Sequence, residues 1–286
     1  MLNKKVILIC GYSRGGTNIL WNILQSHPAI CSPKYETGTI FKKNKHLKFN
    51  RYISIARRLG VLETSLSYSI IDLQLYRYKM DTLKMSDNKY KTETELYTRK
   101  EVSQSALCLK SVDYDIDEAN FLRKIYPGIY IIFLIRNGYA VANGHMRRGM
   151  DIEKSATLYS EVGQKMRQIH QVHPRTIYVS FEEVLKNPFS VSEQLYKFTE
   201  VEPVKIQKLR FKSKMIINEK ANEKPSFGEV NQKYWFDRNA ITKMLDLQIN
   251  QKQIGRLTSS QIDSYNRIAA SQLELFGYDL LNPSHK

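Results

Sequence analysis

Residues 4–28 constrain the fold of this chain more than any other stretch. Residues 6–10 form a short, wholly apolar run, which is typical of a strand buried in a parallel sheet. Three glycines interrupt this pattern in residues 11–17, and apolar residues then recur at helical spacing. A strand, a glycine-rich turn and a helix aim backbone N–H groups at one point, which suits a phosphate group. An ordinary strand-to-helix turn that needs glycine is the alternative.

The glycine-rich turn differs from the loop of ATP- and GTP-binding proteins. That loop reads G-x-x-x-x-G-K-[ST], with the lysine on the terminal phosphates and the hydroxyl on magnesium. Counted from Gly11, the second glycine is Gly16, but Thr17 and Asn18 stand where the lysine and the Ser/Thr belong. Arg14 is the one cation inside the turn. The turn therefore predicts a nucleotide whose transferred group needs no metal, and it argues against a kinase or a nucleotide hydrolase.

The composition is that of a globular protein with an anionic partner. The 286 residues are enough for one complete core, and 42% of them are hydrophobic. The net charge of +16 favours a nucleotide, a nucleic acid, an acidic glycan or a membrane surface as partner. The three cysteines have no metal-binding spacing and are expected to be reduced core residues of a cytoplasmic protein. The first strand leaves no room for a signal peptide, and no apolar run is long enough to span a membrane.

Apolar segments that read as strands alternate with helical segments along the chain. This alternation predicts an α/β fold with a single doubly wound parallel sheet flanked by helices. One domain is expected over residues 1–286, with residues 42–105 as a mainly helical, polar insertion that forms a lid on the acceptor side. The expected strands lie at 6–10, 29–32, 107–109, 129–135 and 176–179.

Residues that follow the expected strands carry the chemistry. In doubly wound sheets, ligands bind beyond the carboxyl ends of the strands. That rule brings the turn at residues 11–17 together with Glu36, Lys110 and Arg136. A solvated turn glutamate and a surface lysine at a strand end are the ordinary alternatives for the first two residues. The convergence of one carboxylate and several cations on one crevice is stronger support for a site than any of them alone.

With these residues in view, the chain resembles the sulfotransferases that use 3′-phosphoadenosine 5′-phosphosulfate (PAPS). The resemblance is closest to the tyrosylprotein sulfotransferase type and its bacterial relatives, and it implies their P-loop-like fold. GYSRGGTN resembles the family's 5′-phosphosulfate loop, and SHPAICSPKYET is similar to the segment that carries the catalytic base, here Glu36. LCLKS matches the family lysine that helps to hold the sulfuryl group, here Lys110.

The segment FLIRNGYAVANG resembles the family's 3′-phosphate element, with two departures. Arg136 is kept, but Asn-Gly-Tyr replaces the usual Asp-Gly-Arg, and Gly144 stands where the family has a phosphate-binding serine. Asn143 is the expected substitute for the lost hydroxyl. Arg148, on the helix after this segment, and Arg256, in a stretch that resembles the family's closing loop, are further expected contacts to the nucleotide.

The resemblance implies in-line sulfuryl transfer to a hydroxyl group. Glu36 is the expected general base, with His145 as its rival, and Arg14 and Lys110 are expected to stabilise the developing negative charge. His145 alone on its helix is more often structural. No metal is expected. The residues expected to bind PAPS are Arg14, Gly15, Gly16, Thr17, Asn18, Arg136, Asn143, Gly144, Arg148 and Arg256.

Other interpretations stay open at this point. They are a P-loop-like nucleotide kinase, a non-catalytic basic protein that binds nucleotides or nucleic acid, and an inactive sulfotransferase relative. No nucleic-acid partner is expected, because the chain has no zinc-finger, helix-turn-helix or aromatic RNA-binding motif. The acceptor is a hydroxyl-bearing tyrosyl peptide, glycan or small metabolite, the last two being favoured, and both neutral and anionic acceptors stay open. The oligomeric state is undetermined.

Overall fold

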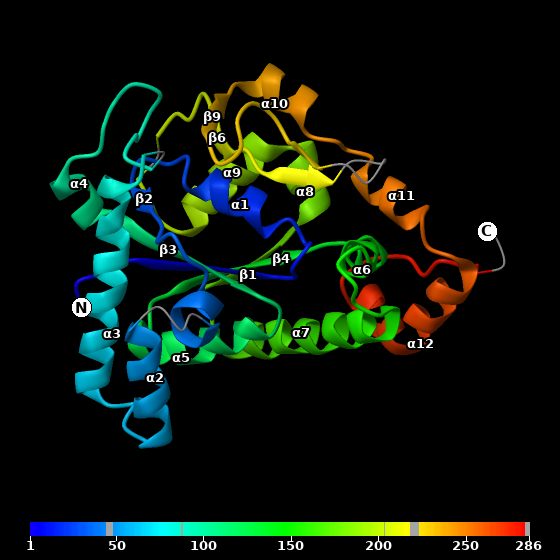
Figure 1. Ribbon diagram of the computed structural model, residues 1–286, viewed down its shortest axis with the longest axis horizontal. Coiled ribbons are helices and arrows are strands. Elements are labelled where there is room, and N and C mark those ends of the chain that lie inside the picture. The colour runs from blue at the N-terminus through cyan, green and yellow to red at the C-terminus, as the bar shows by residue number, and fades with distance from the viewer. Residues whose placement is uncertain (44–47, 87, 203, 218–222, 284–286) are drawn as a thin grey trace.

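A five-stranded parallel sheet forms the centre of the computed structural model, with the strand order β2-β3-β1-β4-β5 (Figure 1). The structure describes residues 1–286 except 44–47, 87, 203, 218–222 and 284–286. Each neighbouring pair of strands in this sheet is parallel, so the predicted doubly wound α/β fold is confirmed. The strands are β1 (Val6–Gly11), β2 (Ile30–Cys31), β3 (Ala106–Val112), β4 (Tyr130–Ile135) and β5 (Thr176–Ser180).

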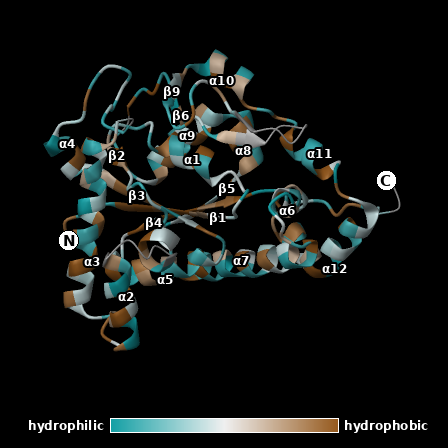
Figure 2. Cartoon of the chain, in the orientation of Figure 1, coloured by the Kyte–Doolittle hydropathy of each residue, from teal (hydrophilic) through white to brown (hydrophobic). Residues whose placement is uncertain are grey.

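Strand β1 is the middle of the sheet and is buried along its whole length. Successive side chains of a strand point to opposite faces of the sheet. Ile7 and Ile9 accordingly pack into the core on one face, and Leu8 and Cys10 pack into the core on the other. Figure 2 shows β1 as a brown, hydrophobic ribbon between the two layers of helices. Burial on both faces explains why this strand reads as a continuous apolar run in the sequence.

Helices cover both faces of the sheet (Figure 1). Nearly every connection between parallel strands is a helical crossover, which places helices on both sides. None of the helices in the described part of the chain has the length and apolarity that crossing a membrane requires. One core contains α1 (Thr17–Leu24), α8 (Phe181–Lys186), α9 (Pro188–Phe198) and α10 (Arg238–Met244). The other contains α2 (Lys48–Arg58), α3 (Ser65–Met80), α5 (Glu118–Ile125), α6 (Gly138–Met146), α7 (Ile152–Val172) and α12 (Ser259–Leu275).

The structure corrects the predicted sequence limits in several places. Strand β3 continues to Val112, so Lys110 lies inside a buried strand and not after its end. The second predicted strand shortens to the two residues of β2. Two antiparallel pairs that the sequence did not predict lie beyond α9: β6 (Leu209–Lys212) pairs with β9 (Lys233–Phe236), and β7 (Met215–Ile217) pairs with β8 (Glu223–Pro225). The three cysteines are buried and form no disulfide.

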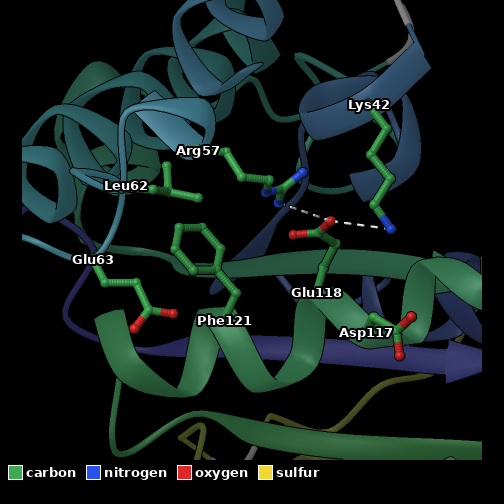
Figure 3. Close-up of a pocket in the computed structure, with 8 residues that line it drawn as sticks. Lys42, Arg57, Leu62, Glu63, Asp117, Glu118 and Phe121 are labelled. Atoms are coloured by element: carbon green, nitrogen blue, oxygen red, sulfur yellow. Dashed lines mark ion pairs between the residues drawn. The ribbon is translucent and has the colours of Figure 1, made fainter. Parts of the chain in front are cut away.

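The predicted insertion divides into two parts. Its helices α2 and α3 pack into the core beside α5, and residues 44–47 and 87 lie outside the described part of the chain. Figure 3 shows that Lys42 and Arg57 both approach Glu118 of α5, at 3.1 and 3.6 Å between the charged atoms. The second part contains a 3-10 helix (Asp81–Lys84), a β-bridge between Tyr90 and Leu96, and α4 (Arg99–Gln104).

A buried carboxylate joins α3 to the start of the chain. Asp72 is 2% exposed and accepts hydrogen bonds from the backbone N–H of Leu2 and of Asn3. The side-chain amide of Asn3 and the hydroxyl of Tyr126 donate to the same carboxylate, at 2.9 and 2.8 Å. Buried charges are tolerated only with such partners. Asp72 therefore connects the insertion to the chain segment just before β1.

We predict that Asp72→Ala destabilises the protein strongly. The substitution leaves the backbone N–H of Asn3 and the hydroxyl of Tyr126 buried without an acceptor, which is expected to lower the free energy of unfolding by about 3 kcal/mol. Urea unfolding followed by circular dichroism measures the loss. Asp263→Ala is the matched control, because among the described residues Asp263 has one ion pair, an exposed one with Arg267. Its effect should stay below about 0.5 kcal/mol. Equal effects of the two substitutions would contradict the prediction.

Candidate functional site

In the glycine-rich turn between β1 and α1, the backbone lies so close to neighbouring groups that there is no room for side chains at two positions. Gly16 precedes α1 with a φ of 91°, and a Cβ atom there would overlap the ring of Phe181. A Cβ atom on Gly15 would lie 2.8 Å from the carbonyl oxygen of Tyr12. Arg14 adopts a left-handed φ of 63°, which is uncommon for a residue other than glycine. The turn leads directly into Thr17, the first residue of α1, so the N–H groups of the first helical turn face the position a phosphate would take.

A buried ammonium group links three segments at the site. Lys110 is 1% exposed, and its Nζ atom lies 2.6 Å from Oε1 of Glu36 and 2.6 Å from Oδ1 of Asn18. The same atom lies 4.6 Å from the ring centre of Trp21. Burial lowers the pKa of Lys110, while the charge of Glu36 acts in the opposite direction. The structure thus brings together three of the predicted residues, although Asn18 turns its side chain to Lys110.

Glu36 lies at the boundary between this ion pair and an open cavity. Its side chain is 39% exposed, in contrast to the buried Lys110. The cavity has a volume of about 720 Å³, and Asn18, Trp21 and Met85 also line it. A carboxylate in this position is able to accept a proton from a hydroxyl group in the cavity. Met85 belongs to the predicted insertion, so one short part of that insertion reaches the cavity beside Glu36.

Arg136 is buried beneath α11 (Ile249–Ile254) and supports the glycine-rich turn. It is 5% exposed, and its Nη1 donates to the carbonyl oxygen of Arg14 at 2.6 Å. Its Nε and Nη2 donate to the side chains of Asn250 and Gln253 of α11, at 2.9 and 2.6 Å. The guanidinium carbon lies 4.2 Å from the ring centre of Phe181. Burial lowers the pKa of Arg136 to about 10, and the residue remains a cation at neutral pH.

The side chain of Arg14 packs against Gly144 of α6. A Cβ atom on Gly144 would lie 2.8 Å from Cβ of Arg14, so this contact explains why glycine stands at the predicted serine position. Burial and the charges of Arg148 and Arg147 lower the pKa of Arg14, so the guanidinium groups of both residues are close enough to Arg14 to act on it. Asn143 is 6% exposed, and its Oδ1 atom has no hydrogen-bond partner in the described part of the chain.

The last predicted cation lies farther along the chain. Arg256 follows α11 directly, its side chain is exposed, and its backbone N–H donates to the carbonyl oxygen of Gln253. Gln253 is one of the two side chains that bind Arg136. The structure therefore connects Arg256 to the site through α11, which covers Arg136.

His145, the rival base, is held between two serine hydroxyl groups. Its Nε2 lies 2.8 Å from Oγ of Ser13, and its Nδ1 lies 2.8 Å from Oγ of Ser155. The residue is 3% exposed and is not among the described residues that line the Glu36 cavity. Burial lowers the pKa of His145, while the charge of Asp113 opposes this effect. The ring is therefore neutral at pH 7, and it joins the glycine-rich turn to α6 and α7.

We predict that His145 contributes to acid sensitivity. Its pKa is lowered by folding, so below about pH 6.5 the unfolded chain binds a proton that the folded protein does not. The stability that His145 provides is thus complete above the unfolded pKa and is lost as the pH falls through the folded pKa. Unfolding measured from pH 7.5 to 5 should depend on pH less steeply in His145→Gln than in the parent protein. Unchanged pH dependence would contradict this expectation, and titration of the His145 ring followed by NMR gives its pKa directly.

Sequence reasoning missed several residues of the site. Trp21 lies one helical turn after Asn18, and this spacing was a usable signal for its place beside Lys110. Lys212 and Lys214 line the Glu36 cavity but belong to the unpredicted antiparallel strands and the turn between them. No motif marks them, since only the path of the chain after α9 brings them to the cavity.

Comparisons with known proteins agree with this architecture. The model of the sulfotransferase family matches residues 6–205, and the chain belongs to this family. The sulfotransferase domain of the Synechococcus PCC 7002 olefin synthase is similar in fold, with 19% identity, a TM-score of 0.58, and coverage of 97% of this chain and 96% of that one. The sulfotransferase domain from the curacin biosynthetic pathway has 16% identity, a TM-score of 0.53, and coverage of 97% and 99%. No curated protein matches the chain in sequence.

Proposed function

We propose that this sulfotransferase takes its sulfuryl group from PAPS and transfers it to a hydroxyl group of an acceptor. The observation that carries the proposal is the position of Lys110, whose buried ammonium group contacts both Asn18 of α1 and Glu36 at the cavity. This arrangement joins an anion-binding turn to a carboxylate that faces a space for an acceptor. The tyrosylprotein-like type and the cytoplasmic location suggested by the sequence are part of the same proposal.

The residues at the turn fit the phosphate groups of such a donor. Close packing at Gly15 and Gly16 and the first N–H groups of α1 suit a 5′-phosphate. The guanidinium groups of Arg14 and Arg148 suit a second phosphate, because planar guanidinium groups bind phosphate oxygens in pairs. Binding of a phosphate by Asn143 stays a prediction from the family motif, because the side-chain atom without a partner among the described residues is its oxygen, which accepts hydrogen bonds as a phosphate does.

Arg136 has a different part in this proposal. Its three kinds of nitrogen already donate to Arg14, Asn250 and Gln253. Arg136 is also 5% exposed, so these partners and its burial leave it little access to a ligand, and direct contact between Arg136 and a 3′-phosphate stays a prediction from the family motif. In the present arrangement Arg136 acts through the backbone of Arg14, which it holds in the left-handed conformation. It also adds a positive charge beneath the turn.

Each catalytic residue has a defined task in the transfer. The bound donor supplies a sulfuryl group, whose bond to the 5′-phosphate oxygen breaks with its electron pair while the acceptor oxygen bonds to sulfur, leaving 3′,5′-adenosine bisphosphate. Glu36 takes the proton that the acceptor hydroxyl loses. Lys110 and Arg14 stabilise the charge that develops on the leaving phosphate and the sulfonyl oxygens. Asn18 and Trp21 hold Lys110 in place.

Metal independence belongs to the proposal as well. It rests on Thr17 and Asn18, which stand where a magnesium-dependent P-loop has its lysine and hydroxyl residue. The task of the metal, which is to neutralise the leaving group, falls to Lys110 and Arg14. Turnover that is unchanged by a chelator would support this, and turnover that requires added magnesium would favour the kinase alternative.

We predict that the protein prefers 3′,5′-adenosine bisphosphate to 5′-AMP by at least tenfold in dissociation constant. The second phosphate gains charge-assisted hydrogen bonds from Arg14 and Arg148, each worth about 1.5–3 kcal/mol, or roughly 10- to 100-fold. Isothermal titration calorimetry measures both ligands. Arg148→Gln should remove most of the preference, while Arg267→Gln on the exposed surface of α12 should keep it. Equal affinity for the two nucleotides would refute the choice of donor.

We predict that Glu36→Gln lowers kcat by about a hundredfold or more, because the amide cannot take the proton from the acceptor. Transfer of labelled sulfate from PAPS to an acceptor found by screening hydroxyl compounds gives the rate. Affinity for 3′,5′-adenosine bisphosphate should change little, which separates lost catalysis from misfolding. Glu63→Gln is the control, since Glu63 is exposed and pairs only with Lys124 among the described residues. Full activity of Glu36→Gln would show that another group is the base.

A further inference from the structure

The cavity beside Glu36 has an unusual distribution of charge. Four lysines line it, and among the described lining residues Glu36 is the single carboxylate. Glu36 itself pairs with Lys110, so it does not balance the other cations. The lysines come from three separate parts of the chain: Lys34 precedes Glu36, Lys212 and Lys214 lie at the end of β6 and after it, and Lys233 begins β9.

These lysines have few anionic partners. No carboxylate in the described ranges lies within 4.0 Å of the ammonium group of Lys34, Lys212 or Lys214. By contrast, Lys208, just before β6, pairs with Glu93 at 2.6 Å on the surface nearby. Although Lys214 is exposed at the surface, desolvation by neighbouring protein atoms and the charge of Lys110 lower its pKa to about 8, with Lys212 and Arg14 acting in the same direction and Glu36 opposing them.

The register of the antiparallel strands β6 and β9 is a separate observation that favours anion binding by these lysines. Lys212 and Lys233 are direct partners in the register of the two strands. Like charges placed opposite each other destabilise a strand pair. Lys233 turns to the side chains of Asn88 and Gln25, which are neutral. A bound anion beside Lys212 and Lys214 would reduce this repulsion.

We propose that the acceptor is an anionic molecule, with its hydroxyl group at Glu36 and an oxyanion group, either phosphate, sulfate or carboxylate, held by Lys212 and Lys214. This inference rests on the proposed function, because it assigns the other half of the same site. The cavity volume of about 720 Å³ is within the usual range for small-ligand sites and fits a molecule of the size of a modified sugar. Lysine suits this task because its compact ammonium group is a mobile point charge that accepts oxyanions of different shapes.

A set of sugars on one scaffold tests the proposal. Galactose, galactose 6-phosphate, galactose 6-sulfate and galacturonic acid differ only in the oxyanion group, and each is titrated by calorimetry into protein saturated with 3′,5′-adenosine bisphosphate. We expect at least one charged sugar to bind at least tenfold more tightly than galactose, and the order of the three identifies the preferred oxyanion. Lys214→Gln and Lys212→Gln should each remove most of that advantage.

Control variants separate the cavity from the general positive charge of the protein. Lys243→Gln and Lys186→Gln remove the same charge from exposed positions on α10 and α8, and they should keep the advantage of the charged sugar. Lys214→Arg should restore it and extend it above pH 8, where the parent lysine loses its proton. Since Lys214 is charged below its pKa, the affinity of the parent protein for the charged sugar should fall as the pH rises through about 8.

The experiment distinguishes a wrong acceptor proposal from a wrong proposed function. If none of the charged sugars binds better than galactose, or if all four lysine-to-glutamine variants lose affinity equally, the proposal of an anionic acceptor is wrong. These outcomes leave the proposed donor intact, because binding of 3′,5′-adenosine bisphosphate is measured first and by itself. Failure of that first titration would instead refute the proposed function.

Discussion

The buried ion pair of Lys110 is the interaction on which the site depends. An ammonium group at 1% exposure inside a central strand is unfavourable unless fixed partners replace its water. Glu36 and Asn18 supply those partners, at 2.6 Å each, from the segment after β2 and from the start of α1. The cost of burying Lys110 therefore fixes the distance between the glycine-rich turn and the segment after β2. A hydrophobic residue at this position would relieve that cost, but it would leave Glu36 and the turn unconnected.

A second buried cation acts on the other side of the turn. Arg136 donates to the carbonyl oxygen of Arg14, and α11 supplies the remaining acceptors. The turn is thus held from below by Arg136 and from the side by the contact of Arg14 with Gly144. The uncommon left-handed backbone of Arg14 persists because both neighbours restrict it. The family motif has serine at position 144, but in this chain the side chain of Arg14 occupies the space that a serine side chain would need.

The parts that the sequence predicted are those built from local patterns. The five strands, the helices between them and the glycine-rich turn follow from apolar runs and helical spacing, and the rule for ligand sites in doubly wound sheets indicated Glu36, Lys110 and Arg136 together. The antiparallel pairs after α9 were not predictable in this way. Strand β6 contains Arg210, which is buried against the carbonyl oxygens of Gln25 and Tyr90, so contacts distant in sequence decide its structure. The burial of the Lys110 side chain inside β3 also depends on contacts distant in sequence, and it was not predicted.

The two halves of the site are built differently, and this has a physical consequence. The proposed site for the 5′-phosphate uses one continuous segment, in which strand, turn and helix fix each other's geometry through the backbone. The acceptor side combines single side chains from the insertion, from the segment before Glu36 and from the β6–β9 pair. A substitution on the donor side disturbs the turn itself, whereas Lys212 or Lys214 can change without moving the backbone that holds Glu36. With the site as we propose it, the choice of acceptor can therefore change while the transfer chemistry stays the same.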